Sequence, residues 1–510
     1  AIKIISFSCP AIVFLLRCPP PFRIFGAFLS PSSDSLFIKH TMLRILYNKA
    51  LFLFKLKKPN TLWMPAHFSE GIVLQQQAKV PVWGKAEPGL TIRISASWQS
   101  EIVETTTTAH GVWNLRLTTP RAGGPFSLRI TDGHQTIHLQ EVFIGEVWLC
   151  SGQSNMEWSA NMGILNGRLE IEAAHHPQIH FFNVTRHASE IPLDHLKGRW
   201  QACTPASMQN FSAVAYFFAR RLQEVLNVPI GLIQAAWGGT PAEVWIPENA
   251  LMADAFLREA AKKQMPRLWG PHEPGRTYNA MIQPLWPYKI AGVLYYQGES
   301  NVENAYAYEA LLETLIRSWR TEWAEQLPFY IAQIAPYDYE IPEAGVVVRE
   351  AQRRVVSKLA ASGLVVTSDI GNVQDIHPMN KQDVGLRFAN LVLNSHYQQE
   401  MGLTSSPIFR KAVQKGEQTI VYFENALGLR TSDGAPPSHF ELAGPSGEFL
   451  SVLAKIVQDT VILTSPELTT PTQIRFAWHN TATPNLVNGA GLPASCFKGE
   501  VENFVDKADA

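Results

Sequence analysis

The most informative stretch of the chain is Glu146-Val-Trp-Leu-Cys-Ser-Gly-Gln-Ser-Asn-Met-Glu-Trp158, in which a strand-like run leads into a polar turn. Residues 147–150 favour a β-strand, and the small polar residues 151–155 favour a turn or loop. This pattern places Ser154 at the exposed end of a buried strand. A serine there becomes a nucleophile only if a base and a group that stabilises negative charge reach it.

Three further polar turns follow strand-like runs later in the chain. They are Trp237-Gly-Gly-Thr240, Tyr296-Gln-Gly-Glu-Ser-Asn301 and Asp375-Ile-His-Pro378. The last turn supplies a histidine with a carboxylate two residues before it. Ligands of parallel sheets bind beyond the carboxyl ends of the strands, so the four turns predict one shared site.

The hydrophobic pattern divides the chain into regions. Between 61 and 144 apolar and polar residues alternate and turn signals recur, which is typical of a small antiparallel β-sandwich. From 145 to 403 strand-like runs alternate with helical patterns, which predicts a parallel sheet with helices on both faces. Strand signals return between 404 and 510. We expect a three-layer α/β/α core with a β-sandwich-like region before it and another after it.

Within the central region, three helices are predicted, each followed by a strand. The helices are expected at 213–226, 308–319 and 346–359, and the strands at 230–237, 329–334 and 364–368. Ser212 is expected to cap the first helix. Two segments of weaker periodicity, 167–206 and 247–277, are interpreted as insertions, and the second is a candidate lid over the site.

Residues 1–60 form a poorly defined N-terminal segment. Its apolar runs are short or interrupted by basic residues, and none reaches about 18 residues, so no membrane span is predicted. The segment is interpreted as a degenerate export signal, an interfacial amphipathic segment, or translated sequence upstream of a true start at Met42 or Met64, and the last is favoured. Localisation follows from this choice: periplasmic or secreted with an export signal, otherwise cytoplasmic.

The charge balance excludes some classes of partner. The formal net charge is −1, from 43 basic and 44 acidic residues, so no long-range field attracts nucleic acid or an anionic membrane. The five cysteines lack metal-binding or redox spacing. No metal or other cofactor is expected.

The four motifs together resemble a known family. Met156 stands where the nucleophile elbow of α/β-hydrolases has its second glycine, which excludes that arrangement. In their order, the motifs resemble those of the SGNH (GDSL-like) hydrolases and, among them, the sialate O-acetylesterase family, from about Leu62 to Lys498. The resemblance implies a serine esterase that removes acetyl groups from O-acetylated carbohydrate, either sialic acid or a plant polysaccharide, through an acyl-serine intermediate.

The resemblance also implies roles for individual residues. Ser154 is interpreted as the nucleophile, with Ser151 as a competitor. His377 is expected to be the general base, oriented by Asp375. In the wider superfamily the acid lies three residues before the histidine, a position that Gln374 occupies here, so Asp369 is the alternative acid.

Negative charge in the transition state needs hydrogen-bond donors. We expect them from the Ser154 backbone, from Gly238, with Gly239 as its alternative, and from the Gln297 side chain, with Asn301 as the alternative to Gln297. The residues expected to contact the substrate are Asn155, Trp158, Trp245 and Asn301, although both tryptophans suit a hydrophobic core equally well. Glu299 is interpreted as a hydrogen-bond brace.

Two other functions stay open. Within the same class, the chain is an acetyl xylan esterase or another polysaccharide deacetylase. In a different class, two β regions and 14 tryptophans suit a carbohydrate-binding protein with an inactive hydrolase core. The presence of Ser154, His377 and Asp375 argues against the inactive protein.

Overall fold

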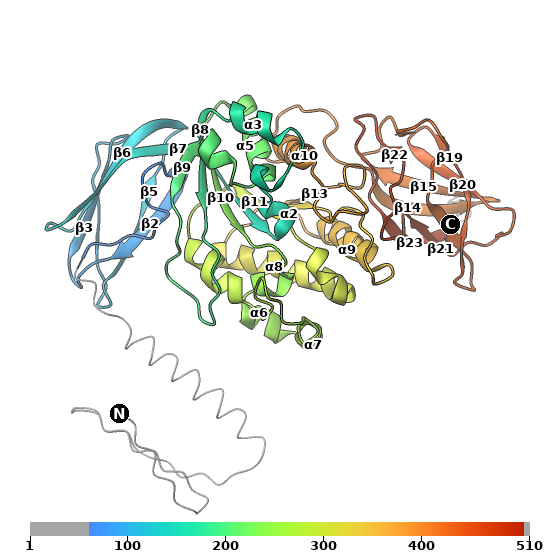
Figure 1. Ribbon diagram of the computed structural model, residues 1–510, viewed down its shortest axis with the longest axis horizontal. Coiled ribbons are helices and arrows are strands. Elements are labelled where there is room, and N and C mark those ends of the chain that lie inside the picture. The colour runs from blue at the N-terminus through green and yellow to red at the C-terminus, as the bar shows by residue number, and fades with distance from the viewer. Residues whose placement is uncertain (1–60, 504–510) are drawn as a thin grey trace, which may run out of the picture. The chain divides into compact units, whose positions relative to one another are not determined.

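The structure is a computed structural model that describes residues 61–503 (Figure 1). The predictions made for residues 1–60, including the alternative starts and the export signal, fall outside the described residues. The described residues belong to one compact unit that begins at Pro59.

A β-sheet with the strand order β13-β12-β11-β7-β10-β8-β9 forms the centre of the molecule. Its strands are β7 (Thr136–Gly152), β8 (His176–Asn183), β9 (Trp200–Cys203), β10 (Ile230–Ala236), β11 (Gly292–Tyr296), β12 (Phe329–Ala332) and β13 (Ser362–Val365). Every neighbouring pair on this path is parallel except β8 and β9. The predicted parallel sheet is therefore confirmed, and the carboxyl ends of its strands share one edge.

Successive side chains of the central strands enter two different hydrophobic clusters. In β7, Val147 and Leu149 belong to one cluster, whereas Trp148 and Cys150 belong to the other. Side chains of a strand alternate between the two faces of its sheet, so both faces here are apolar and must be covered.

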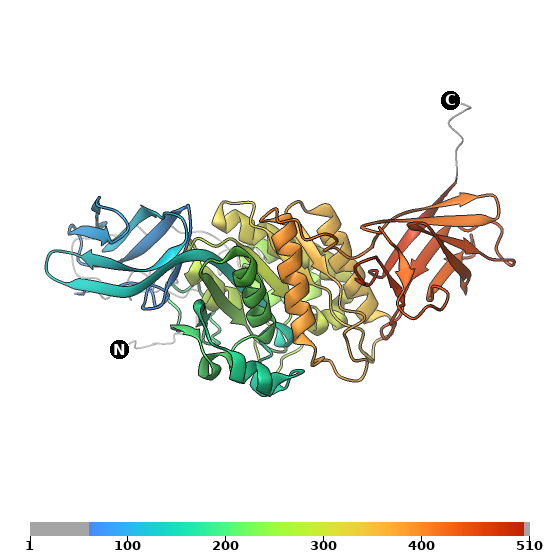
Figure 2. The same ribbon diagram turned by 90° about the horizontal axis from the view of Figure 1, so that it is seen from above.

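Helices cover both faces (Figure 1 and Figure 2). Helices α5 (Ala213–Leu226) and α10 (Lys381–Ser395) pack over the face that carries Trp148, and α8 (Tyr308–Trp323) and α9 (Ala344–Lys358) over the opposite face. The Ser212 hydroxyl accepts a hydrogen bond from the Ala215 N–H at 3.1 Å and caps α5, as predicted. The three predicted helices are confirmed to within a few residues at their ends.

Short helical segments make up much of the connections. They are α2 (Ser154–Glu157), η1 (Ala160–Met162), α3 (Gly167–Ala173), α4 (Pro205–Met208), η2 (Ala242–Trp245), α6 (Glu248–Ala253), α7 (Ala255–Ala261), η3 (Tyr278–Ile282), η4 (Gln283–Leu285) and η5 (Glu299–Ala307).

The region before the core is built from mostly antiparallel strands. They are β1 (Val73–Gln75), β2 (Lys79–Lys85), β3 (Thr91–Ala96), β4 (Val103–Thr106), β5 (Val112–Thr118) and β6 (Gly123–Thr131). Strand β2 pairs with β5, whereas β6 and β1 pair with the first half of β7. Because β7 continues into the central sheet, the division expected at residue 144 lies inside a single strand.

The region after the core contains an eight-stranded sheet with the order β18-β17-β21-β23-β14-β15-β20-β19. Its strands are β14 (Ile408–Lys415), β15 (Gln418–Glu424), β17 (Phe440–Ala443), β18 (Phe449–Ser451), β19 (Leu453–Val457), β20 (Thr460–Thr464), β21 (Gln473–Phe476) and β23 (Phe497–Asn503), while β16 (Arg430–Thr431) pairs with β22 (Leu486–Val487). The second β region is confirmed.

Two local predictions were wrong. Strand β8, inside the segment interpreted as an insertion, is an internal strand of the central sheet, and its residues 179–182, three of them apolar, are buried. Strand β13 ends at Val365 instead of near Ser368. The ladder with β12 ends at the pair Ala332 and Val365, and beyond it the Thr367 side-chain hydroxyl donates to the Gln333 carbonyl at 2.7 Å.

Candidate active site

Ser154 and His377 meet at the carboxyl edge of the central sheet. The serine begins α2 directly beyond β7, and its Oγ lies 2.8 Å from Nε2 of His377, which is 223 positions away in the chain. Gly152 precedes this turn with φ of +137°, and a Cβ there would lie 2.1 Å from the Tyr296 carbonyl oxygen. Only glycine fits this crossing, so the close approach of β7 and β11 fixes where the serine emerges.

The loop between β13 and α10 carries His377. Its imidazole stacks on the Trp158 indole, with ring centres 4.1 Å apart and an angle of 17° between the planes. Burial, followed by the charge of Lys381, lowers the pKa of His377 below its ordinary value of 6.5, and Asp375 acts in the opposite direction. The imidazole is therefore mostly neutral at pH 7 and able to accept a proton.

The two candidate acids have different surroundings. The Asp375 carboxylate is exposed and accepts the backbone N–H of His377 at 2.9 Å. Within residues 61–503 it makes no hydrogen bond to the imidazole, so its effect on the ring is electrostatic. The alternative acid, Asp369, pairs with Arg387 through two hydrogen bonds of 2.7 and 2.6 Å.

Asn155, expected at the substrate, is instead fully buried beneath the serine and the histidine. Its Nδ2 donates to Oε1 of Glu299 at 2.6 Å and to the Ile376 carbonyl at 2.9 Å. Its Oδ1 accepts a hydrogen bond from Nζ of Lys381 at 2.6 Å. Asn155 thus ties the serine turn to the histidine loop, because both lie within reach of one short amide. Glu299 is a hydrogen-bond brace in this arrangement, as interpreted from the sequence.

Lys381 was missed in the sequence analysis. Its Nζ also donates to the Pro378 carbonyl at 2.7 Å, and burial lowers the pKa of this ammonium from 10.5 to about 7. A lysine in the first turn of a helix opposes the helix dipole. That unfavourable position, three residues after Pro378, is the signal that could have drawn attention to it.

Gln297 does not supply a donor to the pocket. Its side chain is fully buried, with Oε1 accepting from the Tyr308 hydroxyl at 2.9 Å and Nε2 donating to Oδ1 of Asn301 at 2.7 Å. Asn301 is buried as well, and its amide bonds the Ala242 N–H and the Glu243 carboxylate. Both amides are occupied by partners inside the protein, so neither reaches the substrate space.

The two tryptophans differ. Trp158 lines the candidate pocket, where it supports His377. Trp245 is fully buried in the hydrophobic cluster under α8, and its Nε1 donates to Oγ1 of Thr240 at 3.0 Å. Trp245 therefore lies in the core and does not line the cavity at which it was expected to contact substrate.

A cavity of about 480 Å³ opens next to Ser154 and His377. The residues that line it are Gln153, Ser154, Glu157, Trp158, Met162, Arg186, Gly238, Gly239, Arg267, Trp269, Glu299, Ser300, Ile376 and His377. The segment predicted as a lid contributes Arg267 and Trp269. Both expected glycines are present, and a Cβ on Gly238 would lie 3.3 Å from the Ser154 Cβ.

The backbone N–H of Gly238 donates a hydrogen bond to a carboxylate. Oε2 of Glu157 accepts this hydrogen bond at 2.9 Å, and its Oε1 accepts one from Nε of Arg186 at 2.5 Å. The sequence analysis missed both residues. Glu157 stands in the opening motif and was available to it, whereas Arg186 lies in the loop between β8 and β9, where no pattern marks it.

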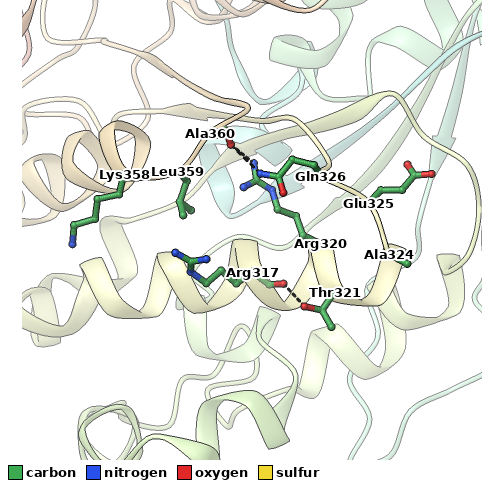
Figure 3. A pocket seen from close by; sticks show the side chains of 9 residues that line it. All are labelled: Arg317, Arg320, Thr321, Ala324, Glu325, Gln326, Lys358, Leu359 and Ala360. Atoms are coloured by element: carbon green, nitrogen blue, oxygen red, sulfur yellow. Dashed lines mark hydrogen bonds between the residues drawn. The ribbon is translucent and has the colours of Figure 1, made fainter.

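A second cavity, of about 600 Å³, lies at the C-terminal ends of α8 and α9 (Figure 3). Its lining contains no serine, histidine or cysteine. The Arg320 guanidinium, which points into this region, donates to the carbonyls of Leu327, Ala360 and Ala361. Because its most buried cation is already bonded to the protein, this cavity is the weaker candidate for a site.

Residues 61–503 contain neither a metal-binding cluster nor a helix that could span a membrane. In this range no three histidine, cysteine or acidic side chains gather as a metal-binding group. No helix in the same range is long and apolar enough to cross a bilayer.

The chain is similar to known esterases. Residues 144–394 match the family model described as carbohydrate esterase, sialic acid-specific acetylesterase. The sialate O-acetylesterase of Homo sapiens is 31% identical over 274 residues, which are 50% of this chain and 52% of that protein. The Mus musculus sialate O-acetylesterase is 29% identical, covering 62% of this chain and 70% of that one. The match to the Homo sapiens relative therefore spans about half of its length.

A solved structure is similar over most of its length. The crystal structure of a carbohydrate acetylesterase from Xanthomonas citri superposes with a TM-score of 0.79 and 33% identity. The similarity covers 86% of this chain and 99% of the Xanthomonas chain, so it includes the β regions on both sides of the core.

Proposed function

This chain belongs to the sialic acid-specific acetylesterase family of carbohydrate esterases, and on that basis we propose that it hydrolyses acetyl esters of sugar hydroxyl groups. The observation that carries the proposal is the 2.8 Å contact between Ser154 Oγ and His377 Nε2 at the wall of an open cavity. A hydroxyl that can lose its proton to a neighbouring imidazole is the requirement for acyl transfer to serine.

The proposed reaction has two halves. Ser154 Oγ attacks the acetyl carbonyl carbon while Nε2 of His377 takes the hydroxyl proton, and the imidazolium then protonates the departing sugar oxygen. Water, deprotonated by the same imidazole, next attacks the acyl-serine and releases acetate. General-base assistance of this kind contributes roughly 10²–10⁴ in rate. The Asp375 carboxylate stabilises the imidazolium through its charge.

The oxyanion donors that we propose are backbone groups. Ser154 and Gly238 both line the cavity and lie against each other, and the Gly238 N–H already binds a carboxylate oxygen, that of Glu157. In the reaction, the ester oxygen takes the place of that carboxylate at Gly238. One well-placed donor is worth about 2.7–4 kcal/mol of transition-state stabilisation.

The substrate that we propose is an O-acetylated sialic acid, in keeping with the names of the mammalian relatives. An acetylated plant polysaccharide such as xylan is the second candidate. The name of the similar bacterial enzyme, a carbohydrate acetylesterase, is compatible with either substrate. A binding protein with an inactive core is the alternative from another class.

Acetate release tests the proposal. We expect the protein to hydrolyse p-nitrophenyl acetate, and Ser154→Ala to lower kcat by at least about 10³-fold, because the nucleophile is lost. The matched control is Ser151→Ala, which removes a buried hydroxyl three residues earlier, in β7, and should leave turnover close to that of the parent protein. Undiminished turnover in Ser154→Ala, or none in the parent protein, would favour the binding protein. Comparing 9-O-acetylated sialic acid with acetyl-xylan then distinguishes the substrates.

A further inference from the structure

An exposed tryptophan lines the cavity of the proposed active site. Trp269 has 61% of its surface exposed, although it borders the same cavity as Ser154 and His377. Large aromatic side chains usually bury most of their surface, so an indole left open beside a catalytic pair is available to a ligand. The face of an aromatic ring is electron-rich and attracts the C–H groups of an apolar ligand face.

Contacts to neighbouring residues hold this indole in place. Nε1 of Trp237 donates to the Trp269 carbonyl at 2.8 Å. The indole packs directly on Gly239, where an added Cβ would lie 2.1 Å from its Nε1. Gly239 also has a φ of +74°, so glycine is required there twice over. A ring fixed before the ligand arrives loses little entropy on binding.

The same cavity offers polar partners for hydroxyl groups. Glu157 accepts from Gly238 and from Nε of Arg186, and the Arg186 side chain is about half exposed. The terminal nitrogens of this guanidinium have no acceptor within the part of the chain that the structure describes. An apolar ring wall together with a carboxylate and free N–H donors is complementary to a pyranose, which has apolar faces and a rim of hydroxyl groups.

We propose that Trp269 is the platform on which the acetylated pyranose ring stacks, with Glu157 and Arg186 binding its hydroxyl groups. The inference rests on the proposed function and adds a sugar subsite to it. The ring concerned is the one that carries the ester. Gly239, on which the indole lies, adjoins Gly238, and Gly238 lies against Ser154. Two consecutive glycines, Gly238 and Gly239, therefore lie between the Ser154 side chain and the Trp269 indole.

Selectivity between sugar and non-sugar esters tests the platform. In Trp269→Ala we expect the ratio of kcat/KM for acetylated xylo-oligosaccharides or 9-O-acetylated sialic acid to that for p-nitrophenyl acetate to fall by about tenfold, mainly through KM, because a lost aromatic contact costs about that factor. Trp269→Phe keeps an aromatic face and should recover most of the ratio. The control Leu268→Ala alters the neighbouring, fully exposed side chain, which does not line the cavity. An unchanged ratio in Trp269→Ala would overturn the platform.

A binding measurement separates this inference from the proposed function. Titration calorimetry with xylo-oligosaccharides and N-acetylneuraminic acid on Ser154→Ala protein needs no turnover. Weaker binding in Ser154→Ala/Trp269→Ala than in Ser154→Ala supports the platform even if the parent protein hydrolyses no ester. Equal binding to the two proteins refutes it even if the parent protein is an active esterase.

Discussion

Lys381 carries a buried charge close to the proposed catalytic base. Its ammonium holds Asn155 and the Pro378 carbonyl, the residues on either side of the contact between Ser154 and His377. With a pKa of about 7, it is protonated in the acidic range where His377 titrates. A positive charge there disfavours the imidazolium. Asp375, on the exposed side of the loop, favours it.

The pH profile of kcat/KM tests this balance. The base works only when neutral, so activity falls as the pH decreases through the pKa of His377. Lys381→Met removes the charge that lowers this pKa, and we expect the acidic limb of the profile to move to higher pH. Asp375→Asn removes the charge that raises it, so the limb should move to lower pH. A shift of both variants in the same direction, or of neither, would contradict the assignment.

Among the elements, strand β7 connects the N-terminal β region to the central sheet. Its first half forms ladders with β6 and β1, and its second half with β10 and β11. Glu146 lies at the junction and is buried. Its carboxylate accepts from Gln75 at 2.9 Å, from Gln76 at 2.7 Å and from the Tyr397 hydroxyl at 2.7 Å. The Glu146 carboxylate therefore accepts hydrogen bonds both from residues that precede the central strands and from Tyr397, which follows them.

We expect Glu146→Gln to lower the free energy of unfolding by about 1–3 kcal/mol, because an amide offers one acceptor oxygen and turns an N–H₂ group toward other donors. Urea denaturation followed by circular dichroism measures this difference. The control Glu141→Gln makes the same change at an exposed position of β7 and should have little effect. Equal midpoints for the two variants would show that the junction does not depend on the carboxylate.

At the scale of the whole molecule, the C-terminal β region is fastened to the core through Asn480. Its Oδ1 accepts the Gly345 N–H in the first turn of α9 at 2.8 Å, and its Nδ2 donates to the Ile341 carbonyl at 2.9 Å. From the core, Arg349 donates to the carbonyls of Asn480 and His479 at 3.1 and 2.6 Å. These bonds, which are buried or partly buried, couple the stability of the two regions.

Asn480→Ala removes the side-chain partner of the Gly345 N–H and of the Ile341 carbonyl. We expect it to cost about 2 kcal/mol and to separate the unfolding of the C-terminal region from that of the core. Scanning calorimetry should then show a lower first transition than in the parent protein. Asn503→Ala, at an exposed asparagine of the same region, is the control. A calorimetric trace identical to that of the parent protein would contradict the coupling.

The sequence alone predicted most of the elements and the meeting of Ser154 with His377. Helix α5 follows from its cap at Ser212 and its apolar periodicity, and the alternation of strands and helices predicts the parallel sheet. Ser154 and His377 were identified because each stands in a distinctive turn beyond a strand. These features are local, since turn chemistry and periodicity are properties of neighbouring residues.

Only the tertiary structure decided the direction of the buried polar side chains. Asn155 was expected to face the substrate, yet it bonds Glu299 and Lys381, which are 144 and 226 positions away. The Gln297 side chain likewise points inward. It bonds Gln153, just beyond the neighbouring strand β7, and Tyr308 in α8. A buried amide takes the orientation that satisfies its hydrogen bonds, and its partners are known only when distant segments are brought together.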